Sequence, residues 1–186
     1  MPDMILFLLP ALALLAVALV LNRRLGFLSQ RPAHYTGTTP DFDIRRHLDG
    51  PMLCEGVIYG PLGRVNSRFT AQMQGRWEGN RGVLDERFHY AGGNVQDRQW
   101  RLTLGNDGTI HAEADDLLHP GSGRQEGASV QLCYRIRLPR HAGGWVLDVT
   151  DWMYLMENGT IINRSQFRKF GIKVAELVAT MRRVDA

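Results

Sequence analysis

The sequence predicts an all-β protein, an antiparallel barrel of about eight to ten strands that follows one N-terminal transmembrane helix and a short helix. Two patterns predict the barrel. From Met52 onward apolar and polar residues alternate with period two, as in strands with one face buried. Turn sequences rich in Gly and Asn interrupt this alternation at short intervals, as between the strands of β-hairpins. A long uncharged stretch at the start of the chain predicts the transmembrane helix.

Composition argues for one globular domain behind a membrane segment. The chain has 186 residues, of which 44% are hydrophobic and 22% are charged, and its formal net charge is +3. These values exclude a disordered chain or a low-complexity polymer. The basic residues are scattered among 19 acidic ones, so the basic stripe of a nucleic-acid-binding protein is absent and no nucleic-acid partner is predicted.

Residues 4–21 (MILFLLPALALLAVALVL) carry no charge. As a helix they would span about 27 Å, which nearly crosses a bilayer. A cleaved export signal is the alternative, but basic residues in front and a small-residue cleavage site behind are both missing. No Cys stands near the end of the run to accept a lipid. We therefore expect a retained anchor over residues 1–25, with the membrane as a partner.

Residues 26–40 form a predicted linker, because they have no periodicity and contain Gly, Pro and Thr. The barrel domain is predicted over residues 41–186. It opens with a short helix over 41–50, for which Asp41 is the expected N-cap and Gly50 the left-handed end. Pro51 prevents the helix from continuing.

The strands follow in order along the chain. Residues 119–127 are expected to be a Gly-rich loop. The last stretch, 172–183, fits either a helix or a strand, and the strand is favoured because a last strand paired with the first would close the barrel. The first expected strand begins at Met52, and the later ones cover residues 65–77, 83–90, 98–104, 109–114, 129–138, 145–156, 160–170 and 172–183.

Three ionisable residues fall on predicted inward faces. Glu86 is in register with Leu84 and Phe88, Arg98 with Trp100, and Asp151 with apolar residues of its own strand. A buried charge needs a partner. Two interpretations remain open: a polar anchor that holds the head group of a ligand in an apolar pocket, or a structural ion pair that closes one end of the barrel.

Four aromatic residues have the same two interpretations. Trp77, Trp100, Tyr134 and Trp152 could form the wall of a ligand pocket or belong to a plain core. Together with Glu86, Arg98 and Asp151 they are the candidate ligand-binding residues.

Other site chemistry has little support in the sequence. The six histidines lack metal-ligand spacing, so no metal is expected, and no cofactor or catalytic residue is assigned. The pair Asp115 and Asp116 is expected to be a solvated strand end. Cys54 and Cys133 fit either one disulfide in an oxidising compartment or two buried thiols.

Several short strings, taken in their order and spacing, resemble the domain of unknown function 3833 family. The resemblance covers residues from about Phe42 to Arg183. The strings are 48–51 (LDGP), 75–77 (GRW), 84–90 (LDERFHY), 98–100 (RQW), 114–116 (ADD), 151–156 (DWMYLM), 162–165 (INRS) and 169–171 (KFG).

This resemblance implies a small proteobacterial envelope protein, often a lipoprotein, with a calycin-like or lipocalin-like barrel and a connection to fatty-acid or lipid modification. It supplies no catalytic residues. It favours a single-pass inner-membrane protein whose domain faces the periplasm. The positive-inside rule points the other way, because Arg23, Arg24 and Arg31 follow the apolar run.

The sequence thus leads to a membrane-anchored barrel that binds or handles an apolar molecule, such as a lipid or acyl chain, at the cell envelope. One alternative is an enzyme of lipid modification, with Glu86 or Asp151 as acid or base and Arg98 stabilising negative charge. The other is a solidly packed interaction module without a ligand. Ligand identity and oligomeric state are left open.

Overall fold

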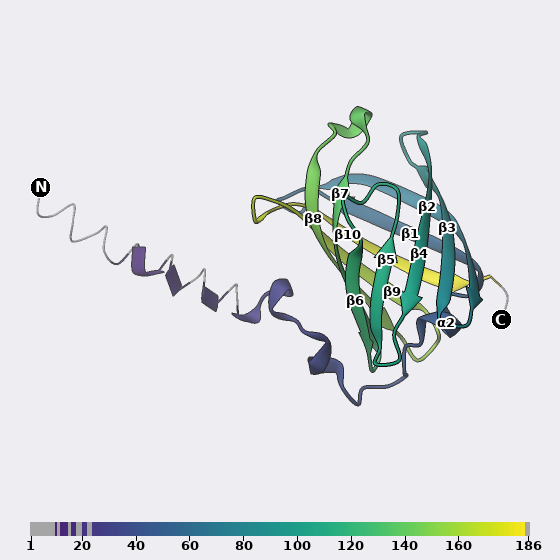
Figure 1. Cartoon of the computed structure of the whole chain (residues 1–186). Helices are drawn as coiled ribbons and strands as arrows, with labels where there is room; N and C mark the ends of the chain where they lie inside the picture. The colour runs from purple at the N-terminus through teal and green to yellow at the C-terminus, as the bar shows by residue number, and fades with distance from the viewer. Residues whose placement is uncertain (1–9, 11, 15, 18–19, 22–23, 185–186) are drawn as a thin grey trace, which may run out of the picture.

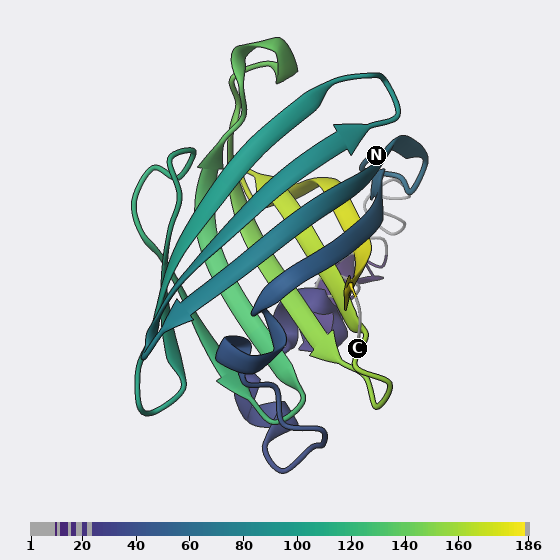
Figure 2. The same ribbon diagram turned by 90° about the vertical axis from the view of Figure 1, so that its right-hand side faces the viewer.

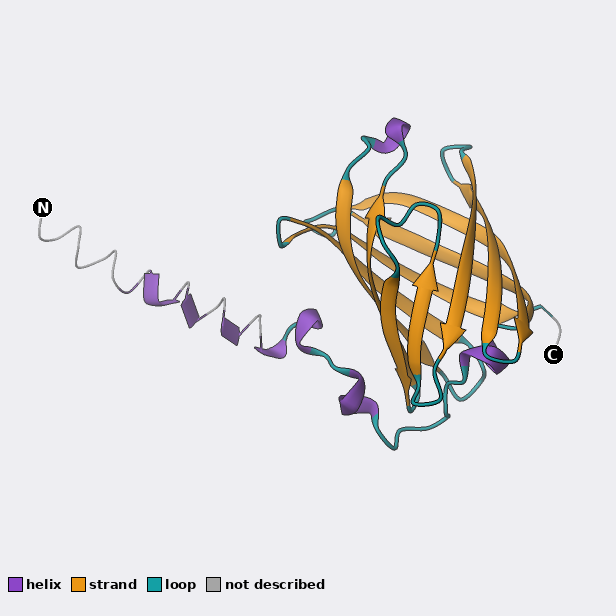
Figure 3. Ribbon diagram, viewed as in Figure 1, coloured by secondary structure: helices purple, strands orange, loops and turns teal. Residues whose placement is uncertain are grey.

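A computed structural model describes residues 10, 12–14, 16–17, 20–21 and 24–184. In this part of the chain ten antiparallel strands form a closed barrel (Figures 1 and 3). The strands are β1 (Gly50–Tyr59), β2 (Val65–Glu78), β3 (Arg81–Tyr90), β4 (Val95–Leu104), β5 (Thr109–Glu113), β6 (Gly121–Glu126), β7 (Ser129–Arg137), β8 (Val146–Leu155), β9 (Ile161–Lys169) and β10 (Ile172–Arg183).

The last strand closes the barrel, as predicted. β10 pairs with β9 on one side and with β1 on the other, and Cys54 of β1 lies opposite Met181 of β10. Each strand therefore has two neighbours, and the sheet has no free edge. The all-β antiparallel prediction is confirmed, and residues 172–183 are a strand rather than a helix.

The Gly-rich stretch 119–127 was wrongly expected to be a loop, because it contains strand β6. Its glycines sit where the backbones of neighbouring strands leave no room for a side chain. A Cβ at Gly123 would lie 2.2 Å from the carbonyl oxygen of Gln131, and one at Gly121 would lie 2.8 Å from Cβ of Tyr134. Glycine here allows close approach of two strands and does not mark a turn.

A short helix, α2 (Ile44–His47), covers one end of the barrel, below the strands in Figure 2. Its N-cap is Asp43, whose side chain accepts a hydrogen bond from the Arg45 amide at 3.0 Å, so Asp41 was the wrong cap. Leu48, which follows the helix, is buried and turns its carbonyl toward β2. At Gly75 of β2 a Cβ would lie only 1.7 Å from that carbonyl oxygen.

The turns that join β1 to β2, β3 to β4, β5 to β6, β7 to β8 and β9 to β10 all lie at the opposite end, because neighbouring strands are antiparallel (Figure 2). We call this the open end, and the end under α2 the closed end. The turn between β7 and β8 contains a 3-10 turn, η3 (Arg140–Ala142).

The predicted linker contains two 3-10 turns, η1 (Phe27–Ser29) and η2 (Pro32–Tyr35), and packs against the outside of the barrel. The ring centroid of Tyr35 lies 5.3 Å from that of Trp152, and Gln30 accepts a hydrogen bond from Tyr154 at 2.8 Å. The predicted membrane segment, 4–21, lies largely outside the described residues. Among the residues that are described, none of the helices has the length and apolar character needed to span a bilayer.

Candidate functional site

The interior of the barrel contains a cavity of about 180 Å³. Its walls are mainly aliphatic and aromatic, and Ile44 of α2 and Leu48, which follows α2, line it at the closed end. A void of this size is somewhat larger than one that holds benzene, about 150 Å³, and smaller than the pockets of drug-sized ligands, roughly 300–1,000 Å³. The barrel is therefore not packed solid. The alternative of an interaction module without a ligand requires a solid interior and is not supported.

The three predicted ionisable residues, Glu86, Arg98 and Asp151, all line this cavity. Glu86 and Arg98 lie directly opposite each other on β3 and β4. Asp151 projects from β8 on another part of the wall, opposite Ser165 of β9. Period-two alternation thus placed these three side chains on the inner face correctly.

Glu86 is a buried carboxyl without a full set of partners. Its exposure is 9%, and its Oε2 atom has no hydrogen-bond partner in the structure. Burial raises the pKa of Glu86 to about 7, although the Arg98 charge opposes this and the Asp151 carboxylate adds to it. A carboxyl that titrates near neutral pH can donate or accept a proton, and can hydrogen-bond a ligand in either state.

Arg98 is held in place from several sides. Its Nε lies 3.0 Å from Oδ2 of Asp116, and its guanidinium carbon lies 4.1 Å from the ring centroid of Trp100 and 5.7 Å from that of Tyr134. Burial by itself would lower the pKa of Arg98, but the surrounding negative groups, Glu86 and Asp116 among them, raise it. Arg98 therefore stays charged inside the barrel.

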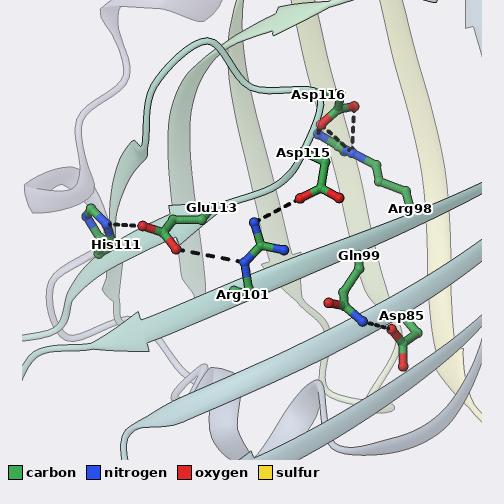
Figure 4. Close-up of polar contacts among 8 residues, drawn as sticks. All are labelled: Asp85, Arg98, Gln99, Arg101, His111, Glu113, Asp115 and Asp116. Carbon is green, nitrogen blue, oxygen red and sulfur yellow. Dashed lines mark hydrogen bonds and ion pairs between the residues drawn. The ribbon is translucent and has the colours of Figure 1, made fainter.

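Asp116 was wrongly expected to be a solvated strand end. It belongs to the loop between β5 and β6 at the open end, and its carboxylate reaches into the cavity to Arg98 (Figure 4). Its neighbour Asp115 points outward and pairs with Arg101 at 3.0 Å, with 90% of its side chain exposed. The Arg98–Asp116 pair is thus an ion pair at the wall of the cavity.

Asp151 has polar partners that the sequence analysis missed. Ser165 donates a hydrogen bond to it at 2.8 Å, and the Asn163 amide donates another. Burial raises the pKa of Asp151, while these two hydrogen bonds act in the opposite direction. The signal was present in the sequence, since Asn163 and Ser165 alternate with outward residues between the buried Ile161 and the half-buried Phe167.

The four aromatic candidates divide into two pairs. Trp100 and Tyr134 line the cavity and meet edge to face, with ring centroids 5.1 Å apart. Trp77 does not line it and lies at the closed end, where its Nε1 donates to the Leu48 carbonyl at 3.3 Å. Trp152 is also absent from the lining.

Trp152 points out of the barrel because it follows Asp151 directly, and successive residues of a strand face opposite sides. It is nonetheless fully buried, with 0% exposure, because Tyr35 and Tyr154 cover it on the outer face. Trp77 and Trp152 therefore hold α2 and the N-terminal segment against the barrel.

Both cysteines are free thiols, so the alternative of a disulfide is wrong. Cys54 lines the cavity, and burial raises the pKa of its thiol to about 12. Cys133 is exposed on the outer face, so the expectation of two buried thiols holds only for Cys54. In the described part of the chain no three His, Cys, Asp or Glu residues are grouped as metal ligands.

Fold and site together define a closed antiparallel β-barrel with an internal, mainly apolar cavity that contains charged groups. The model of the family described as Protein of unknown function (DUF3833) matches residues 22–183, and the chain belongs to this family. No curated protein matches the chain.

Several solved structures resemble the barrel, among them the following two. One is the crystal structure of Rv2717c from M. tuberculosis, with a TM-score of 0.56 and 13% identity, over 80% of this chain and 99% of that one. The other is the S-type phycobiliprotein lyase CPES from Guillardia theta, with a TM-score of 0.56 and 7% identity, over 77% of this chain and 92% of that one. At these identities the likeness shows a shared fold.

Proposed function

We propose that the protein binds a small amphipathic molecule, mainly apolar and with one polar group, inside the barrel. The observation that carries the proposal is the cavity of about 180 Å³, which has apolar walls and three ionisable side chains, Glu86, Arg98 and Asp151. Apolar pockets with a few convergent polar groups are the usual form of small-molecule sites.

The arrangement around Arg98 favours an anionic head group. Asp116 comes from a loop and occupies the position on Arg98 that a ligand carboxylate would take. A carboxylate that displaced Asp116 would keep Arg98 paired and would regain a charge-assisted hydrogen bond. Glu86, with its unpartnered Oε2, could share a proton with the same head group.

A lipid or acyl chain is the ligand class that we propose. Because the cavity is only slightly larger than one that holds benzene, a long chain would place part of its length inside and leave through the open end. The setting that we propose is the cell envelope, with residues 4–21 as the inner-membrane anchor and the barrel in the periplasm. Protease protection of a C-terminal tag in intact and permeabilised spheroplasts would test this orientation.

A second candidate function is acid–base catalysis on such a molecule. It is favoured by one observation, the buried Glu86 whose pKa lies near 7 and whose free oxygen faces the cavity. The Glu86→Gln variant separates the two functions. Retained binding with lost turnover would indicate acid–base catalysis by Glu86, and turnover equal to that of the wild type would exclude Glu86 as the catalytic group.

Mass spectrometry of molecules that co-purify with the full-length protein tests the binding proposal. Ala179 lines the cavity and is 3% exposed, so Ala179→Leu fills part of the space. Ala33→Leu makes the same change at an exposed position outside the barrel. We expect a bound amphipathic molecule in the wild type and in Ala33→Leu, and its loss in Ala179→Leu. Identical spectra for all three proteins would contradict the proposal.

A further inference from the structure

The open end of the barrel exposes an unusual number of large apolar side chains. From residue 50 to residue 184 nine such side chains are exposed, and seven of them stand on or beside the open-end turns. The other two are Leu53 on the outer wall and Met156 at the closed end. We call the open-end group the rim and follow five members of it: Leu62, Leu118, Trp145, Phe170 and Ile172.

These five rim members come from four different turns, and the turns β7–β8 and β9–β10 contact each other. The ammonium of Lys169 lies 3.0 Å from the ring centroid of Trp145 and 5.5 Å from that of Phe170. Phe170 is 91% exposed and Leu62 is 97% exposed. Concentrated exposed apolar surface on a folded domain marks an interaction site.

Phe170 is held in a backbone conformation that disfavours it. Its φ is +52°, and Gly171 beside it has a φ of +77°, so the pair forms a two-residue turn with two left-handed residues. Asn-Gly is the sequence that suits such a turn, and a bulky residue with positive φ is strained. The hairpin itself gains nothing from an exposed phenyl ring here, which points to a role for the ring outside the fold.

The charges around the rim are unbalanced and positive. Arg64, Arg68, Arg137, Arg140 and Lys169 lie on or next to the open-end turns, and within the described residues none of them is in an ion pair.

The acidic residues near the rim are already neutralised. Asp97 pairs with Arg87, Asp115 with Arg101 and Asp116 with Arg98. The closed end differs, since several of its carboxylates have no ion-pair partner among the described residues. Those carboxylates are Asp41, Asp49, Glu78 and Glu157.

We propose that the rim docks onto the surface of a bilayer that contains anionic lipids, so that the open end faces the membrane. Exposed aromatic and aliphatic tips would enter the headgroup region, and the unpaired Arg and Lys side chains would lie against lipid phosphates. This orientation would place the mouth of the cavity against the lipid. The proposal does not depend on which ligand the cavity holds, or on whether it holds one.

The test measures the distance of the rim from lipid in the full-length protein. The protein is reconstituted in vesicles of phosphatidylcholine, alone or mixed with phosphatidylglycerol, that also contain a nitroxide-labelled lipid. An environment-sensitive dye is attached in a Cys133→Ser background, where the remaining Cys54 is buried. One protein carries the dye at Asn94→Cys in the β3–β4 turn of the open end, and a second at Glu157→Cys in the β8–β9 turn of the closed end.

We expect lipid quenching at Asn94→Cys that needs phosphatidylglycerol and weakens at high salt, and little quenching at Glu157→Cys. Phe170→Asn suits the turn, so the fold should persist while the ratio of docked to undocked barrels falls roughly tenfold. Lys169→Gln should lower that ratio about fivefold. Met156→Asn, at the closed end, is the matched control and should change nothing.

Equal quenching at both dye positions would overturn the proposal, and so would quenching at Asn94→Cys that Phe170→Asn leaves unchanged. Dye self-quenching that rises with protein density, without lipid quenching, would instead assign the rim to contact with a second copy of the chain. Ala179→Leu keeps the two proposals apart, because a filled cavity should leave docking unchanged.

Discussion

The substitution Glu86→Gln should change how the stability of the protein depends on pH. Burial raises the pKa of Glu86 from its ordinary 4.5 to about 7. The folded chain then holds this proton more tightly than the unfolded chain. The resulting stabilisation is complete below pH 4.5 and is lost as the pH rises toward 7. At about 1.4 kcal/mol for each pH unit, the total is about 3 kcal/mol.

Gln keeps the shape of the protonated side chain and does not titrate. The free energy of unfolding of the wild type minus that of Glu86→Gln should therefore fall by about 3 kcal/mol as the pH rises from 4.5 to about 7. Urea denaturation of the detergent-solubilised protein, followed by tryptophan fluorescence, measures it. Glu55→Gln is the control, because the Glu55 side chain is 52% exposed and pairs only on the surface. A difference that does not vary with pH would refute the buried, proton-holding state of Glu86.

Three further predictions concern other parts of the molecule. Asp116→Asn removes the carboxylate that pairs with Arg98, so anionic apolar probes should bind roughly tenfold more tightly in a fluorescence titration. Weaker binding would show that the Asp116 carboxylate is needed to position Arg98. Gly75→Ala places a Cβ against the carbonyl of Leu48, the residue that follows α2. It should destabilise the protein by several kcal/mol, about as much as other severe core changes. A melting temperature within error of the wild type would be inconsistent with the position of α2. Residues 26–186 alone should be soluble with a β-type circular dichroism spectrum, and aggregation of this fragment would count against the division between anchor and barrel.

Much of the fold follows from local rules. Alternation identified the inner faces of β3, β4 and β8, which placed Glu86, Arg98 and Asp151 in one cavity. Tight-turn sequences such as Asn158-Gly159 marked hairpin ends. The need to remove sheet edges favoured a strand for 172–183, and that strand does pair with β1.

The remaining features depend on contacts between distant parts of the chain. Alternation shows that Trp152 faces away from Asp151, but it cannot show that Tyr35, far away in sequence, covers Trp152. Asp116 reached the cavity because its loop bends over the open end toward Arg98. The glycines of β6 suited a loop locally, and only the closeness of β7 explains them.

The central claim is that the barrel interior is a binding site, and a titration with a small anionic apolar fluorophore that fits the cavity of about 180 Å³, such as 1-naphthoate, tests it most directly. The account predicts saturable binding of one probe per chain, abolished by Ala179→Leu in the cavity wall and weakened by Arg98→Met. It also predicts that Ala33→Leu, outside the barrel, leaves binding unchanged. Binding that is unsaturable, or that Ala179→Leu and Arg98→Met do not alter, would contradict it.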